Sequence, residues 1–207
     1  MLFGARARRK VADFRSGMAR FCTDRRGAAA IEFAFLAPVL LAMYFVTMEV
    51  SQGIETNKKV SRIASMVADL VTQQSSVTEA DIKAIMDIGI STLQPYNRST
   101  PKIIVSSILI SNDPTPTVTV DWSRKTEDGV FGVDVTKGTP TSVPDTLKLP
   151  GTSLIRVQAQ LSYEPVITWA ASSKQPLGLS AAFDNIPMSE TYYLRARVSN
   201  QVVCTNC

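Results

Sequence analysis

An uninterrupted apolar run constrains this chain more than any other feature. Between Ala28 and Val50 the only charged side chains are Glu32 and Glu49, near the two ends of the run. As an α-helix these residues would extend about 34 Å, which is enough to cross a bilayer core of roughly 30 Å. A carboxylate in hydrocarbon is costly and needs a partner or a function. We therefore expect residues 28–50 to form a transmembrane helix in which Glu32 has a specific role.

The charges that precede this run predict its orientation. Residues 1–27 contain eight Arg or Lys side chains, among them Arg25 and Arg26, and two Asp side chains, which gives a net charge of +6. Basic residues beside a membrane segment are retained on the cytoplasmic side. We expect residues 1–27 to be a basic cytoplasmic leader and residues 51–207 to be exported. No base-reading module accompanies the arginines, so we expect no nucleic-acid partner.

A cleaved secretory signal does not fit this segment. Such a signal has an apolar region of about 7–15 residues followed by a small-x-small cleavage site. The run here is longer, and its far end, Phe45–Val50, contains no such site. Two alternatives remain: an uncleaved signal anchor, or a precursor that is cut before its apolar segment.

The residues around the start of the run resemble a known family. Gly27, with Glu32 in the fifth position after it and Phe33 following, is similar to a type IV prepilin processing site. The sequences RGAAAIEFA and LAPVLL, within residues 26–41, resemble the TadE-like family of the Tad (tight adherence, Flp) pilus system, whose members are bacterial minor pilins or pseudopilins. The resemblance is dense over residues 24–55. A weaker resemblance to longer TadE/TadG-like proteins rests on Ser61–Ser65, Ala68–Val71, Trp122–Ser123 and Cys204–Cys207.

This resemblance implies a processing step and a set of partners. A membrane-embedded prepilin peptidase would cut after Gly27 and leave Ala28 as the new N-terminus. The Glu32 carboxylate could then pair with the N-terminal amine of a neighbouring subunit. In the alternative, Glu32 lies at headgroup level beside Arg25 and Arg26. The implied partners are the inner membrane, other pilins and Tad assembly proteins.

Pro38 lies inside the predicted membrane helix. It removes one intrahelical hydrogen bond, so we expect a bend near Ala34. The bend would either set how the helix packs in a filament or be simply tolerated in a bilayer.

The helical pattern continues beyond the apolar run in amphipathic form. Apolar side chains recur at three- and four-residue spacing over residues 60–71, with charged residues between them. We expect this stalk to reach about Gln73 and to pack on a following sheet rather than to form a coiled coil with a partner. The capping-box-like pair Thr78 and Asp81 predicts a second helix that ends before Pro95.

After this helix the pattern changes to that of β-strands. The segments with β-branched or alternating apolar residues are 102–110, 118–122, 155–163 and 192–198. In the last of them Tyr192 to Val198 should alternate between the two faces. We expect an antiparallel sheet of about four strands packed on the helices, an α+β fold.

Two irregular regions interrupt these strands. Residues 123–152 are rich in Gly, Pro, Thr, Asp and Lys and predict a long surface loop with a short hairpin at Val130–Val135. Residues 165–187 form the second region, in which Trp169 and Phe183 are available to cover the core.

The cysteines favour an exported structural domain. Cys204 and Cys207 are the only cysteines after the leader, which holds Cys22. In an oxidising compartment we expect them to pair as a disulfide, with reactive or intermolecular thiols as the alternative. A redox Cys-x-x-Cys motif needs a strand–helix context, and a zinc site would need two more ligands in a chain that has no histidine. We expect no metal and no other cofactor.

The absence of histidine also argues against catalysis, because it excludes Ser-His-Asp and Cys-His nucleophile systems. The remaining acid pairs are Glu127 with Asp128 and Asp184 with Glu190, all in polar, loop-like stretches. We do not expect an enzyme.

These observations together predict a TadE/TadG-like minor pilin or pseudopilin. It would be anchored in the bacterial inner membrane by residues 28–50, with the domain of residues 51–207 in the periplasm or on an extracellular pilus. It would take part in assembly of an adhesive Tad-type pilus through its helix, while the sheet and residues 123–152 contact other subunits or a surface. Two alternatives stay open: an uncleaved single-pass component of the pilus machine, and a membrane-tethered periplasmic enzyme or ligand-binding module.

Overall fold

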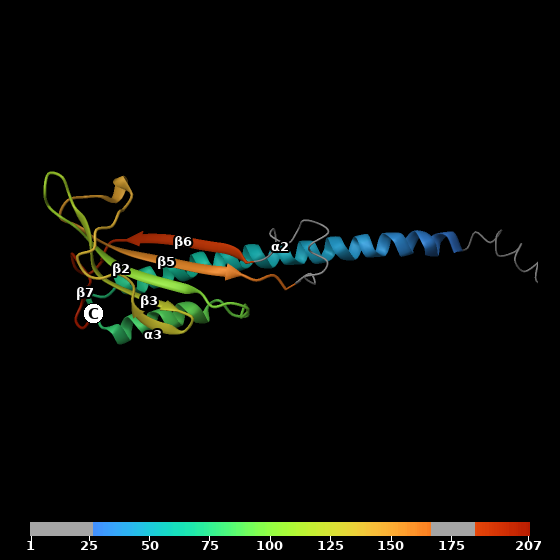
Figure 1. Cartoon of the computed structure of the whole chain (residues 1–207), viewed down its shortest axis with the longest axis horizontal. Coiled ribbons are helices and arrows are strands. Elements are labelled where there is room, and N and C mark those ends of the chain that lie inside the picture. The colour runs from blue at the N-terminus through green and yellow to red at the C-terminus, as the bar shows by residue number, and fades with distance from the viewer. Residues whose placement is uncertain (1–26, 167–184) are drawn as a thin grey trace, which may run out of the picture. The chain divides into compact units, whose positions relative to one another are not determined.

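The computed structural model describes residues 27–166 and 185–207 (Figure 1). The basic leader, with Arg25, Arg26 and Cys22, lies outside the described residues, as do Trp169 and Phe183. The chain divides into two compact units, one that ends at Met48 and one that comprises Glu49–Cys207.

The element order confirms the α+β prediction. The helices are α2 (Ala28–Thr72), α3 (Glu79–Ser91) and the short 3₁₀ helix η2 (Asp145–Leu147). The strands are β1 (Ser76–Val77), β2 (Lys102–Ile110), β3 (Val118–Glu127), β4 (Val130–Val133), β5 (Ser153–Tyr163), β6 (Ile186–Leu194) and β7 (Val203–Cys204). The predicted stalk end near Gln73 and the second helix before Pro95 are both close to the observed bounds.

The described strands form two sheets. The larger is antiparallel with the order β4-β3-β2-β5-β6 (Figure 1). Its inner strands β2 and β5 pair with each other although they are far apart in the sequence. The smaller is the parallel pair of β1 and β7, in which Val77 lies opposite Cys204. A β-bulge in the β2–β3 ladder follows Ser107 and leaves Asp121 as the extra residue of β3.

The main core lies between the helices and one face of the larger sheet. Val60, Ile63, Val67 and Val71 of α2 are fully buried, so the amphipathic stalk packs on the sheet as expected. Their partners include Ile82 and Met86 of α3 and, from the sheet, Ile103, Val105, Trp122, Ile155, Val157, Ala159, Leu161 and Tyr163.

The opposite face of the sheet has a smaller apolar cluster. Ile108, Ile110, Val118 and Leu154 are buried there, and Val143 and Leu147 pack against them. The segment after β4 is therefore held on the sheet rather than forming a free surface loop. Its backbone is also bonded to β3, because Val120 N–H donates to Thr139 O and Thr141 N–H donates to Val118 O.

The sheet has five strands instead of about four, because the predicted hairpin is an integral part of it. β3 does not stop at Trp122 but continues to Glu127, and Asp128-Gly129 then reverses the chain into β4. Both turn residues have positive φ, 50° and 77°, as the two-residue turn favoured in hairpins requires. The sequence pattern does not predict this extension, because a charged residue normally lies on the exposed face of a strand and Arg124 is buried.

The last long strand lies earlier in the chain than the predicted segment 192–198. β6 begins at Ile186, inside the segment predicted as irregular, and Pro187 is tolerated because β6 is an edge strand in the described part of the chain. The strand ends at Leu194 because the backbone then turns to the end of α2, where Arg197 N–H donates to Thr72 O. Arg197 also forms an ion pair with Asp69, 2.5 Å long.

Candidate membrane and assembly segment

The candidate site begins at the N-terminal end of α2. Gly27 is exposed, and a β-carbon built on it would meet nothing within 4 Å. Ala28 is the first residue of α2, so the predicted cleavage point coincides with the start of this helix. Glu32 lies in the next turn, exposed, and forms no hydrogen bond or ion pair with another described residue. Its predicted partner, an amine of a neighbouring subunit, remains a prediction.

The surface of this part of α2 is apolar and uncovered. Phe33 and Phe35 are 67% and 75% exposed, values that would be unfavourable in water. The other exposed large side chains of this stretch are Ile31, Leu36, Val39, Leu40, Leu41, Met43, Tyr44, Phe45 and Val46. They occur on all sides of the helix, as expected for a helix surrounded by lipid or by other helices. The helix is long and apolar enough to cross a membrane, with a mean hydropathy of 2.1 in its most apolar window.

Pro38 lies inside α2, and the helix continues through it. Its ring nitrogen donates no hydrogen bond to the Ala34 carbonyl. The bend that we expect at this point, and its use in packing, remain predictions.

The apolar run ends in a set of specific polar contacts at Glu49. One carboxylate oxygen, Oε1, accepts a hydrogen bond from the Tyr163 hydroxyl at 2.5 Å, and the other, Oε2, accepts one from Val166 N–H at 3.0 Å. Burial, together with the neighbouring Glu49 carboxylate, raises the pKa of Tyr163 to about 12. The end of β5 is thus tied to α2 one residue after Met48.

Arg98 completes this group from the segment between α3 and β2. Its guanidinium carbon lies 4.6 Å from the centre of the Tyr96 ring and 5.4 Å from that of Tyr163, and the two rings are stacked. Arg98 Nη2 donates to the Tyr163 hydroxyl at 3.4 Å, and Nε donates to Glu164 O. Sequence reasoning missed these partners. The only available signal was that Tyr163 is the last residue of an alternating strand.

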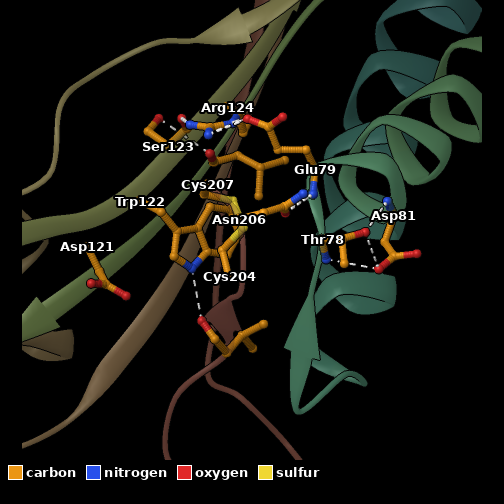
Figure 2. Close-up of a disulfide and its surroundings, with 12 residues drawn as sticks. Thr78, Glu79, Asp81, Asp121, Trp122, Ser123, Arg124, Cys204, Asn206 and Cys207 are labelled. Atoms are coloured by element: carbon orange, nitrogen blue, oxygen red, sulfur yellow. Dashed lines mark hydrogen bonds and ion pairs between the residues drawn. A yellow bond between two sulfur atoms is a disulfide. The ribbon is translucent and has the colours of Figure 1, made fainter.

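The C-terminal segment, with its disulfide, lies against the start of α3 (Figure 2). Cys204 and Cys207 form the disulfide that we expected. Between them Asn206 Oδ1 accepts a hydrogen bond from Glu79 N–H at 2.9 Å, and Thr205 N–H donates to Val77 O. The disulfide therefore closes a turn whose Asn206 side chain binds the backbone at the start of α3.

Two buried side chains of β3 surround this region: Trp122 contacts the C-terminal segment, and Arg124 contacts the first residue of α3. The Trp122 indole N–H donates to Val202 O at 2.9 Å, and Val202 is fully buried (Figure 2). Arg124 donates from Nε and Nη2 to the same Glu79 oxygen, at 2.9 and 2.5 Å. These contacts favour a structural role for the disulfide. Among the described residues no helix follows β7, whereas a redox Cys-x-x-Cys motif lies at a strand-to-helix turn.

Of the acid pairs considered for catalysis, Glu127 with Asp128 is the one that the structure describes, and both residues line one open cavity beside Lys102. Glu127 forms ion pairs with Lys102 at 2.9 Å and Lys125 at 3.3 Å, and its hydrogen bond from Lys102 lowers the pKa of its carboxyl group. A general acid would need the opposite shift. Asp184 lies outside the described residues, and within the described ranges no three acidic or cysteine side chains are grouped as metal ligands.

The fold and this segment together define a class: within its described residues the chain has one apolar helix that is long enough to span a membrane, followed by an α+β domain. Residues 27–69 match the family model described as TadE-like protein, and this match confirms the resemblance for that segment. No curated protein and no solved structure matches the chain.

Proposed function

We propose that this chain is a minor pilin or pseudopilin that takes part in assembly of a Tad-type adhesive pilus. The observation that carries the proposal is the uncovered apolar surface of α2 within the TadE-like segment, directly after an exposed Gly27. A helix with large apolar side chains on all sides needs lipid before assembly and neighbouring helices after it. Both environments are available to a subunit that leaves the membrane for a filament.

In this proposal the orientation follows from the leader. The arginines before Gly27 stay in the cytoplasm, and the domain of residues 51–207 lies in the periplasm. A prepilin peptidase cuts after Gly27. Ala28 then carries a new amine, which is largely protonated near neutral pH.

Glu32 provides the charge complement for assembly. It lies one turn into α2 and has no partner in its own described chain, so its carboxylate is available to the Ala28 amine of a neighbouring subunit. Away from water, such a charge-assisted contact compensates for lost hydration of both groups. The domain supplies the surfaces that contact other subunits, with residues 123–152 as one of them.

Mass spectrometry of the mature N-terminus, in membrane and in sheared-pilus fractions, tests the proposal. We expect the chain to begin at Ala28 in both fractions, and Gly27→Leu to leave residues 1–27 attached. A wild-type chain that keeps its leader and occurs only in membranes would instead identify an uncleaved component of the pilus machine.

The role of Glu32 is tested separately. Glu32→Gln should allow cleavage but reduce incorporation into pili and surface attachment, whereas Glu55→Gln, which removes an exposed acid of α2 beyond the apolar run, should not. Normal piliation in a strain that lacks the whole chain would contradict the assembly role.

A further inference from the structure

The group formed by Tyr96, Arg98 and Tyr163, which we call the Arg98 cluster, has the composition of a site at a membrane surface. Tyr96 and Tyr163 are buried, with 7% and 1% of their surface exposed, and Arg98 is half-buried with its guanidinium over both rings. Tyrosine and arginine combine an apolar body with a polar tip, which suits the boundary between hydrocarbon and water.

The position of the cluster is fixed by Glu49. Tyr163 donates to Glu49, and Glu49 is the residue after Met48, within the last turn of the apolar run Ala28–Val50. A helix rises about 1.5 Å per residue, so Glu49 lies within a few Å of the end of this run. A bilayer that holds the run therefore has its headgroup layer at the level of the cluster.

Arg98 has no direct ion pair within the described residues, and the nearby Glu49 carboxylate is reached only through the Tyr163 hydroxyl. Among residues 27–166 and 185–207 it forms no ion pair with a carboxylate, although it donates to the Glu164 carbonyl and the Tyr163 hydroxyl. Its Nη1 group has no hydrogen-bond partner in the same ranges. A second cation supports the same segment, because Lys59 Nζ donates to Gln94 O at 2.8 Å.

We propose that the Arg98 cluster binds the phosphate of an anionic phospholipid in the leaflet from which α2 emerges. Arg98 would donate from Nη1 to a phosphate oxygen, while the stacked rings hold the guanidinium in place. The bound headgroup would seat the domain on the membrane surface. This inference rests on the membrane anchoring in the proposed function and adds a lipid class and a binding residue to it.

Native mass spectrometry of the full chain in micelles with equal amounts of phosphatidylglycerol and phosphatidylcholine provides the test. The readout is the ratio of the two one-lipid complexes. We expect Arg98→Gln to lower this ratio by up to about fivefold, which corresponds to about 1 kcal/mol for one basic residue near an anionic surface. The leader contributes the same background to every variant.

Arg195→Gln is the matched control. Arg195 is exposed and follows Leu194, which pairs with Ile155 at the end of β5 that is far from Tyr163. The substitution removes the same charge away from the cluster and should leave the ratio unchanged. An equal loss in Arg98→Gln and Arg195→Gln, or no loss in either, would overturn the proposal.

Arg98→Lys addresses the case in which Arg98→Gln fails to fold. Lysine keeps a cation near the rings, so the ratio should stay well above that of the glutamine variant. If the ratio of Arg98→Lys equals that of Arg98→Gln, phosphate binding by the cation at position 98 is contradicted. Flotation of the wild-type chain with pure phosphatidylcholine vesicles tests the anchor alone, so a failure of anchoring is distinguished from a failure of lipid selection.

Discussion

Gly89 of α3 lies directly against Val67 of α2. A β-carbon built on Gly89 would be 2.9 Å from Val67 Cγ2 and 3.2 Å from Ile63 Cγ2. Real β-carbons essentially never approach within 3.0 Å of another heavy atom, so the two helices approach as closely as they do because position 89 has no side chain. This contact sets the distance between α2 and α3.

Gly89→Ala should therefore destabilise the domain. We expect a loss of about 1–3 kcal/mol in the free energy of unfolding, since one added methyl group overpacks a filled core. Gly53→Ala is the control, because its β-carbon would lie 3.9 Å from Tyr163 Cε1, an ordinary contact. That change should stabilise by up to about 1 kcal/mol through helix propensity. Denaturant unfolding of the full chain in micelles measures both, and equal effects would contradict the packing argument.

The raised pKa of Tyr163 predicts that the domain loses stability at high pH. Its pKa is about 12 in the folded chain and about 10 in the unfolded chain, because burial and Glu49 disfavour the phenolate. Between these values the native state holds a proton that the unfolded state has released. The stabilisation is complete below pH 10 and is lost as pH rises through 12, by about 3 kcal/mol in total.

Absorbance titration and unfolding experiments between pH 9 and 12 check this prediction. The difference between wild type and Tyr163→Phe should show one phenol that titrates near pH 12. The variant should also be less stable at pH 8 and lose less stability above pH 10. A titration of this residue near pH 10 would show that the Glu49 contact is not formed.

The disulfide should make a moderate and local contribution. Cys204 and Cys207 close a loop of only four residues, for which chain entropy predicts about 2 kcal/mol. In Cys204→Ser/Cys207→Ser, we expect the amides of Val203 and Thr205, which bind carbonyls of residues 75 and 77, to exchange first. Hydrogen exchange of the full chain measures this, with Cys22→Ser as the control that should change nothing. Uniform loss of protection across β2 and β5 would contradict a local role.

The elements that could be predicted from the sequence are those with a continuous or periodic pattern of apolar residues. The apolar run, the amphipathic stalk and the strands β2 and β5 each have a periodic pattern, and their bounds were close to those observed. The errors occurred where a single tertiary contact overrides the pattern. Arg124 occupies a buried strand position only because Glu79 neutralises it, and β6 ends at Leu194 because the next residues bind the end of α2.

The candidate site divides in the same way. The position of Gly27 and Glu32 at the start of a helix could be predicted from local sequence, because both residues belong to one segment. The contact of Glu49 with Tyr163 joins residues 114 positions apart, so no local pattern reports it. The Asp-Gly pair at positions 128 and 129 is typical of a two-residue hairpin turn, and from it the continuation of β3 into the hairpin with β4 could have been predicted.

The ion pair of Arg124 and Glu79 provides the last prediction. The Arg124 side chain is 5% exposed, and Glu79 is 44% exposed. Removal of the carboxylate therefore leaves a buried cation whose remaining acceptor among the described residues is the Ser123 carbonyl. We expect Glu79→Ala to cost about 2 kcal/mol, less than for a fully buried pair because water reaches Glu79. Asp87→Ala breaks the ion pair with Lys83 on the same helix, where both side chains are 53% exposed, and should cost less than about 0.5 kcal/mol. Denaturant unfolding of both variants measures the difference, and similar losses would mean that Arg124 finds another partner or reaches water when Glu79 is removed.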